Sequence, residues 1–201
     1  MTRLFALLIL ASSATCARAA DLDDTLALCA ACHGDDGLGR AALAAPRLAG
    51  QYATYLADQL RGYKQGTRGV HPEDAPGASM RASAIGLTDA DIDALAQHYA
   101  ALSLDTEGRA PAGESEGASL YAAHCSTCHG ADPRGRGSVY APNLTLLDRT
   151  YLLDQMKAYR QGWRGASDAS TTRARFMRSM AALLQTDGEV ESVVDYIVGD
   201  D

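Results

Sequence analysis

The apolar residues of the chain recur at the spacing of helices. Leu22, Leu26 and Cys29 follow one another at i, i+4 and i+7, which places them on one face of a helix. The stretches 52–65 and 149–161 also read as helices, and we expect each to end at the glycine that follows it. These segments already favour a helical fold.

A further helix is predicted near the end of each half of the chain. Thr88 is followed three residues later by Asp91, the pattern of an acidic capping box at a helix start. The stretch 187–198 carries valine and isoleucine at helical spacing. Residues 66–86 and 130–147 are rich in Gly, Pro and Arg and are predicted as loops. No segment alternates as a strand would, so the predicted fold class is all-α.

The sequence repeats itself after 96 residues, the difference between positions 125 and 29. Such agreement without a gap indicates duplication. We therefore expect two domains, residues 20–104 and 114–201, joined by a linker over residues 105–113. The matched segments are Cys29-Ala-Ala-Cys32-His33-Gly34 with Cys125-Ser-Thr-Cys128-His129-Gly130, Ala45-Pro46-Arg47-Leu48 with Ala141-Pro142-Asn143-Leu144, Tyr55–Gln59 with Tyr151–Gln155, and Tyr63–Gly69 with Tyr159–Gly165.

The beginning of the chain has the features of an export signal. A charged start precedes a short apolar run and then small residues that end at Ala19. We expect residues 1–19 to be a signal peptide that is removed on export to the periplasm, and Cys16 to be lost with it. A retained membrane anchor is the alternative, although the apolar run is too short to span a bilayer. The remaining chain has 16 basic and 25 acidic residues, a net charge of −9, which argues against a nucleic-acid partner.

Each repeat contains Cys-x-x-Cys-His, the attachment pattern of c-type heme. Cysteines at i and i+3 on one helical turn face the same way, so their sulfurs can bond to two vinyl groups along one porphyrin edge. The following histidine then lies under the iron and supplies an imidazole nitrogen. We therefore predict two covalent heme c groups, bound through Cys29, Cys32 and His33 and through Cys125, Cys128 and His129.

Other uses of the four cysteines explain fewer of these features. Exported proteins often form disulfides, but disulfides require no such regular frame. Structural zinc ligands usually come from one compact module, whereas these frames lie 96 residues apart. A thioredoxin-like cysteine pair explains neither the adjacent histidine nor the missing βαβ pattern.

The sixth iron ligand separates electron transfer from catalysis, because an open iron position binds small molecules. Met80 lies 47 residues after His33, and Met177 lies 48 residues after His129. We predict both methionines as iron ligands, with Met180 as a rival for Met177. Thioether ligation raises the reduction potential, as suits a carrier. Three histidines are weaker candidates: His71, His98 and His124.

A ligating histidine needs a partner for its second ring nitrogen, commonly a backbone carbonyl. Pro46 and Pro142 each lie 13 residues past a motif histidine, and we expect their carbonyls to fill this role. Four residues are candidates for orienting heme propionates, with helix packing and surface charge as the alternative: Tyr55, Tyr151, Arg68 and Arg164.

The sequence resembles the diheme cytochrome c4 family over essentially the whole exported chain. The resemblance rests on both Cys-x-x-Cys-His motifs, on Ala45–Gln51, on Tyr-Leu-x-x-Gln-Leu and Lys-Gln-Gly-x-Arg, and on Met80 followed by Gly86–Ile92. It implies two tandem cytochrome c domains about a pseudo-twofold axis, with the hemes close together. The axial ligands it implies are His33 with Met80 and His129 with Met177. The second half departs from the pattern at residues 146–148 and 185–188.

The function predicted is electron transfer in the periplasm, without enzymatic activity. Family members carry electrons from quinol-oxidising bc complexes or dehydrogenases towards terminal oxidases or reductases, so such redox proteins are the expected partners. The alternatives are a fixed cytochrome subunit of a periplasmic dehydrogenase complex and a diheme redox enzyme.

Charge is distributed unevenly between the halves. Residues 20–110 hold 7 basic and 13 acidic residues, whereas residues 134–178 hold 9 basic and 3 acidic ones. We therefore expect an acidic first domain and an arginine-rich patch in the second, each meeting a different redox partner. The alternative is that these arginines are solvated or paired with heme propionates and steer no partner.

Overall fold

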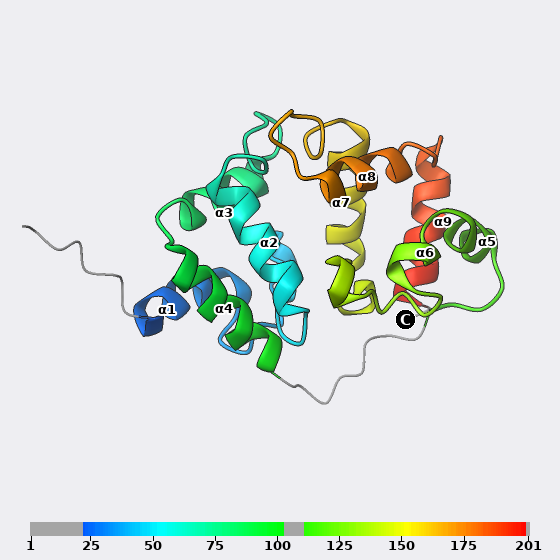
Figure 1. The fold of residues 1–201 in the computed structure, drawn as a ribbon. Coiled ribbons are helices and arrows are strands. Elements are labelled where there is room, and N and C mark those ends of the chain that lie inside the picture. The colour runs from blue at the N-terminus through cyan, green and yellow to red at the C-terminus, as the bar shows by residue number, and fades with distance from the viewer. Residues whose placement is uncertain (1–21, 103–110, 200–201) are drawn as a thin grey trace, which may run out of the picture.

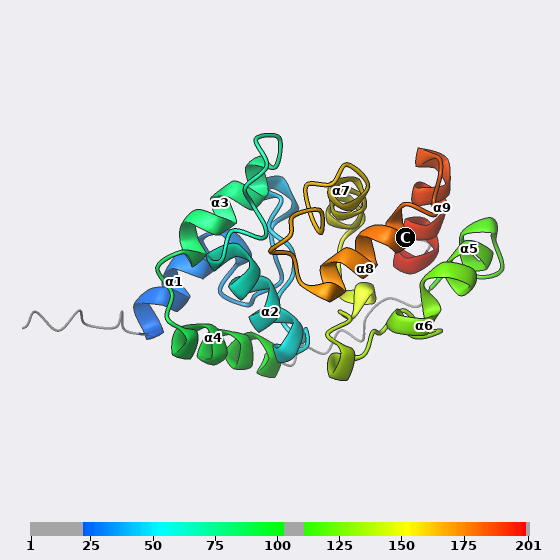
Figure 2. The ribbon, with the colours of Figure 1, turned by 45° about the horizontal axis from the view of Figure 1, so that its top comes forward.

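The structure, a computed structural model, describes residues 22–102 and 111–199, here called the first half and the second half. The expected signal peptide, with Cys16, and most of the expected linker lie outside these residues. The described residues form helices and no strands, which confirms the all-α fold class (Figures 1 and 2). Within them no helix is long and apolar enough to cross a membrane. The first half contains α1 (Leu22–His33), the 3-10 helix η1 (Ala41–Leu43), α2 (Ala53–Lys64), α3 (Ala75–Ala84) and α4 (Asp89–Ala101).

The second half repeats this order with one additional break and one additional 3-10 helix, η3. Where α1 is continuous, the matching helix is interrupted at Cys125 and gives α5 and α6. Its elements are α5 (Glu116–His124), α6 (Ser126–His129), η2 (Gly137–Val139), η3 (Leu144–Leu146), α7 (Arg149–Arg160), α8 (Thr172–Ala181) and α9 (Asp187–Val198). The predicted helices at 52–65, 149–161 and 187–198 are thus confirmed.

The prediction of loops over 66–86 was wrong, because α3 occupies part of that region. This helix begins where the Asp74 carboxylate accepts a hydrogen bond from the Gly77 backbone N–H at 3.0 Å. It is only ten residues long and built mainly of small residues, so it carries little apolar periodicity for sequence analysis to detect. Residues 130–147 likewise include two 3-10 helices, although the rest of that region is irregular.

The last helix of each half begins with a complete capping box. Thr88 accepts from the Asp91 backbone N–H at 3.1 Å, and Thr186 accepts from that of Glu189 at 3.1 Å. The Thr88 backbone N–H in turn donates to Asp91 at 2.8 Å, and that of Thr186 donates to Glu189 at 2.8 Å. The second half therefore starts its last helix as firmly as the first, despite the sequence change at 185–188.

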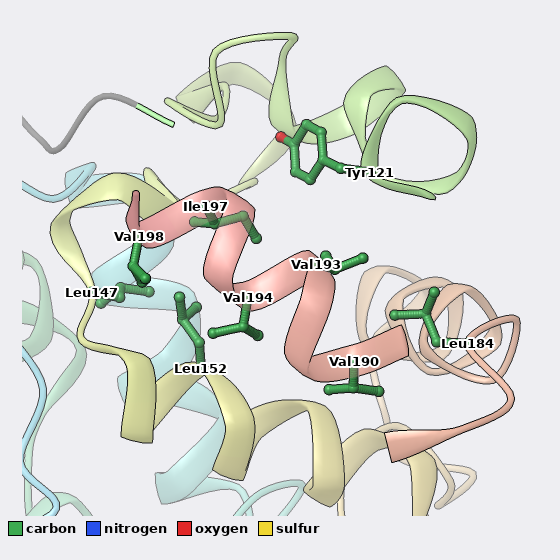
Figure 3. Packing of buried hydrophobic residues seen from close by; sticks show 9 residues of the cluster. All are labelled: Tyr121, Leu147, Leu152, Leu184, Val190, Val193, Val194, Ile197 and Val198. Carbon is green, nitrogen blue, oxygen red and sulfur yellow. The ribbon is translucent and has the colours of Figure 1, made fainter. Parts of the chain in front are cut away.

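Each half has its own small apolar core around its last helix. In the second half, α9 packs against α5 and α7, and Figure 3 shows its apolar side chains pointing towards Leu147, Leu152 and Tyr121. In the first half, Ile92 and Ala96 of α4 pack against Leu56 of α2. These cores place the Cys-x-x-Cys-His helices beside the last helices, since Cys29 and Cys125 contact the two clusters.

Hydrogen bonds join the two halves directly. Gln51 is 1% exposed, and its side chain accepts from the Asn143 backbone N–H at 2.8 Å and donates to the Asn143 carbonyl at 2.9 Å. Tyr52 donates to the Arg134 carbonyl at 3.1 Å, and Thr54 donates to the Gly137 carbonyl at 2.8 Å. The residues after η1 and the start of α2 are therefore hydrogen-bonded to the segment around η2 in the second half.

Candidate heme-binding sites

The two Cys-x-x-Cys-His motifs lie at equivalent places in the fold. Cys29, Cys32 and His33 form the last turn of α1, which brings the two sulfurs to one side of the helix. In the second half Cys125 precedes α6, and Cys128 and His129 lie within it. All four cysteines are free thiols, one half-buried and one exposed in each motif. Burial raises the pKa of the Cys29 thiol, and it raises that of Cys125 to about 11.

Both motif histidines are buried and oriented by a proline carbonyl, as predicted. His33 Nδ1 lies 2.8 Å from the Pro46 oxygen, and His129 Nδ1 lies 3.4 Å from the Pro142 oxygen. A carbonyl only accepts, so each Nδ1 carries the proton and each Nε2 lone pair is free for a metal. Burial lowers the pKa of both histidines, against the hydrogen bonds to the prolines, which favours the neutral imidazole that binds iron.

Two glycines that the sequence analysis passed over make this arrangement possible. Gly39 has φ +86°, and a Cβ there would come within 2.6 Å of the Pro46 carbonyl carbon. Gly135 has φ +73°, and a Cβ there would come within 2.1 Å of the Pro142 oxygen. Only glycine lets the chain approach the proline so closely. Their recurrence at the same offset of 96 is the signal that could have identified them.

Helices α3 and α8 have ten residues each and are equivalent in the two halves, so they show which methionines correspond to each other. Met80 and Met177 both occupy the sixth position of their helix and are half-buried. Met180 corresponds to Ser83, an exposed serine. The spacing between the halves thus grows from 96 to 97 residues before α8, which explains why the two His-to-Met separations differ by one.

The remaining histidine and arginine candidates lie outside the two Cys-x-x-Cys-His motifs. The His71 ring stacks on Trp163 of the second half at 5.2 Å between centroids, and the His98 ring meets Tyr99 edge-on. His124 is half-buried at the end of α5. Arg68 and Arg164 lie where the halves meet, beside the tyrosines that precede them.

The residues of each half fit a covalent heme. Two thiols on one helix side, a neutral buried imidazole with a free nitrogen and a thioether form the donor set of a c-type site. Each half also carries large apolar side chains that are at least 44% exposed and lie close to these donors in sequence. They are Leu28, Leu43 and Ile85 in the first half, and Val139, Phe176 and Leu183 in the second.

Comparison with known proteins agrees with this geometry. The family model described as cytochrome c matches twice, over residues 24–102 and 114–199. The thiosulfate dehydrogenase electron acceptor of Stutzerimonas stutzeri (strain A1501) is 33% identical over 179 residues, 84% of this chain and 76% of that protein.

Two solved structures are similar in fold over most of this chain. Reduced recombinant cytochrome c4 from Pseudomonas stutzeri has a TM-score of 0.68 and 27% identity, over 90% of this chain and 99% of that one. The thiosulfate dehydrogenase TsdBA from Marichromatium purpuratum has a TM-score of 0.65 and 28% identity, over 89% of this chain and 40% of that one. The family model matches both halves, and cytochrome c4 proteins align along most of the chain. The chain therefore belongs to the cytochrome c family and is a diheme cytochrome c4-like electron carrier with two covalently bound hemes.

Proposed function

We propose that the chain is a periplasmic electron shuttle that accepts electrons from a dehydrogenase and delivers them to a terminal oxidase or reductase. The observation that carries the choice of donor is the likeness to the thiosulfate dehydrogenase electron acceptor of S. stutzeri along most of both chains. A thiosulfate-oxidising dehydrogenase is therefore the proposed donor, with a quinol-oxidising bc complex as the other source. Export, with removal of residues 1–19, would bring the chain to these partners.

We propose two domains, residues 20–104 and 114–201, and each domain supplies the ligands of one heme. Cys29 and Cys32 would hold one heme and Cys125 and Cys128 the other, with His33–Met80 and His129–Met177 as axial pairs. When bound, heme supplies a one-electron iron couple. The chain orients the imidazoles through the Pro46 and Pro142 carbonyls and places a methionine at the matching position of α3 and α8. A methionine on each iron leaves no open position for a substrate, which favours a carrier over an enzyme.

A fixed cytochrome subunit is the second candidate. The chain matches 40% of the length of the TsdBA chain, so a similar pair of domains occurs within a longer dehydrogenase protein. A fixed subunit would copurify with its dehydrogenase, whereas a shuttle would separate from it during size-exclusion chromatography at moderate salt.

Stopped-flow reduction of the purified diheme protein tests the donor. We expect thiosulfate with a thiosulfate dehydrogenase to reduce both hemes rapidly, and thiosulfate alone to leave them oxidised. Reduction only by quinol with a bc complex would assign the other donor. Reduction by thiosulfate alone would refute the shuttle and show an enzyme.

Mass spectrometry of the exported protein tests the attachment sites. We expect two heme additions and a start at Ala20. The double variant Cys29→Ser/Cys32→Ser should retain one addition, and so should Cys125→Ser/Cys128→Ser. Two additions in either variant would contradict the assignment.

A further inference from the structure

The methionine helices α3 and α8 bury few residues of their own. Gly77 and Ala84 are the buried residues of α3, and Ala181 is the buried residue of α8. Neither helix contributes a side chain to the apolar clusters around α4 and α9. The position of each methionine therefore depends on contacts other than apolar side-chain packing.

One such contact joins α3 to the loop that follows α2. Gly69 lies in this loop, is buried and has φ +68°. A Cβ on Gly69 would overlap the carbonyl of Gly77, in the first turn of α3, and would lie 3.1 Å from the Cβ of Arg81, which follows Met80. The loop thus meets α3 with bare backbone, and any side chain at residue 69 would push the helix away.

The second half repeats this contact between α8 and the loop that follows α7. Gly165 is buried with φ +75°, and a Cβ there would overlap the Ala174 carbonyl and lie 3.1 Å from the Arg178 Cβ. The two glycines are 96 residues apart, whereas α3 and α8 are 97 residues apart. The contact is therefore the same in loops of different length, which indicates that the contact sets where the helix lies.

The loop that carries each glycine is fastened to the helix before it. The Arg68 backbone N–H donates to the Gly62 carbonyl of α2 at 3.2 Å, and the Arg164 backbone N–H donates to the Ala158 carbonyl of α7 at 3.1 Å. Helix α2 packs on α4, and Cys29 of the first motif contacts the same apolar cluster. The glycine contact therefore links the core that carries the motif to the helix that carries the methionine (Figure 1).

We propose that Gly69 and Gly165 are positioning residues that keep each methionine on its iron and so close the sixth position. This role rests on the proposed function, in which Met80 and Met177 are the ligands. Each methionine is the sixth residue of its helix, so a displaced helix carries the thioether with it. An iron without its methionine binds small molecules, and the chain would lose the closed site that distinguishes a carrier from an enzyme.

Gly69→Ala tests the contact, and Gly66→Ala is its matched control. Both glycines lie in the same loop with similar φ, +68° and +72°, so both substitutions introduce similar backbone strain. At Gly66, however, a Cβ would lie 3.6 Å from the nearest atom, Val70 Cγ1, at ordinary van der Waals distance. Of the two substitutions, Gly69→Ala alone pushes on α3.

Three signals of the diheme protein report the methionine ligand: the sulfur-to-iron charge-transfer absorption, the midpoint potential, and carbon monoxide binding by the ferrous protein. In Gly69→Ala we expect one heme to lose the absorption, to fall in potential and to bind carbon monoxide. Gly66→Ala should keep the absorption of both hemes and exclude carbon monoxide. A loss of stability alone would not separate the two variants in these signals.

Gly165→Ala repeats the test on the second heme, with Gly162→Ala as its control. Gly162 has φ +77°, and a Cβ there would lie 3.5 Å from the nearest atom. The Ala174 carbonyl carbon lies 2.9 Å from the new Cβ at residue 165, whereas that of Gly77 lies 2.6 Å from the one at residue 69. The second-half pair is therefore the milder test, and it decides if Gly69→Ala does not fold.

Equal signals in each glycine variant and its control, whether intact in both or altered in both, would overturn the proposal. Met80→Leu separates the proposal from the assignment of the ligand. Loss of the absorption in Met80→Leu with full retention in Gly69→Ala would overturn the positioning role and leave the ligand assignment intact. An absorption that survives Met80→Leu would refute the ligand, and the positioning role with it.

Discussion

The motif histidines are oriented by atoms that no side-chain motif records. A carbonyl thirteen residues away holds each ring, and a glycine with positive φ lets that carbonyl approach. The prolines carry no N–H, so their segments need no acceptor partner at that position. Position and tautomer of the imidazole are therefore set by backbone conformation as much as by the ligand itself.

The equivalence of α3 and α8 gives a prediction for the methionines. Met80→Leu should lower the potential of one heme and abolish its sulfur-to-iron charge-transfer absorption, because thioether ligation stabilises ferrous iron. Met177→Leu should do the same to the other heme. Met180→Leu is the control and should leave both spectra unchanged, since its counterpart is an exposed serine. A spectrum altered by Met180→Leu and not by Met177→Leu would reverse the assignment in the second half.

At the scale of elements, the duplicated halves differ through two single-residue insertions. One lies between Gly165 and Thr171, and the second lies between Ala181 and Thr186. Both fall in connections between helices, where an extra residue changes the loop and leaves the helix faces in register. The helices of the two halves therefore still correspond in the structure where the two sequences no longer align without gaps.

Close packing of α5 on α9 leads to a prediction for two glycines. A Cβ on Gly117 would lie 1.9 Å from the Ser192 carbonyl oxygen, so Gly117→Ala must push the two helices apart. We expect it to lower the free energy of unfolding by about 1–3 kcal/mol. At Gly188, in the first turn of α9, a Cβ would come no closer than 3.9 Å to a neighbouring atom, Thr186 Oγ1, so Gly188→Ala should be neutral or stabilising by less than about 1 kcal/mol. Chemical denaturation measures both, and equal stability of the two variants would contradict the packing argument.

At the scale of the whole molecule, the interface between the halves is only partly symmetric. Gln51 bonds to the backbone of Asn143, but its counterpart at the offset of 96 is Leu147, which is buried in the second core. The departure of the second half at residues 146–148 thus has a structural reason. One half supplies a polar side chain to the contact, while the other keeps an apolar residue for its own packing.

Loss of the Gln51 contact should uncouple the halves. Gln51→Leu leaves the Asn143 N–H and carbonyl without partners, at a cost of about 1–3 kcal/mol for each buried group. We expect a lower melting temperature and a separation of thermal unfolding into two transitions, measured by calorimetry. Gln65→Leu changes an exposed glutamine and is the control. A single transition at the original temperature would show that Gln51 does not link the halves.

Ion pairs and burial leave fewer exposed positive charges in the arginine-rich patch than the sequence predicts. Arg149 pairs with Asp195 and Arg160 with Asp187, both at 2.6 Å, while Arg173 pairs with Asp58 of the first half. Arg164 is buried. Arg136, Arg175 and Arg178 stay exposed, with no ion pair among the described residues. A partner drawn to the second half would therefore meet a smaller positive surface than residue counts suggest.

Ionic strength tests whether this surface steers a partner. We expect electron transfer with one redox partner to slow as salt rises, because screening weakens attraction between exposed charges. Arg136→Gln/Arg175→Gln should reduce that rate by up to about tenfold at low salt and leave it unchanged at high salt. Arg40→Gln, an exposed arginine of the first half, is the control. Rates with both partners that ignore salt would refute steering and leave the cytochrome assignment intact.

Sequence by itself determined the duplication, the all-α class and both Cys-x-x-Cys-His sites, because these depend on residue type and short spacing. It also placed the helices at 53–64, 149–160 and 187–198 to within a residue or two. The sequence did not predict helix α3, since a short helix of small residues lacks apolar periodicity. Contacts such as Arg68 with Gln155, Gln51 with Asn143 and Arg173 with Asp58 join residues 87, 92 and 115 positions apart. Only the tertiary structure decided these contacts, because charge pairing and burial depend on which surfaces meet, and no local spacing encodes that.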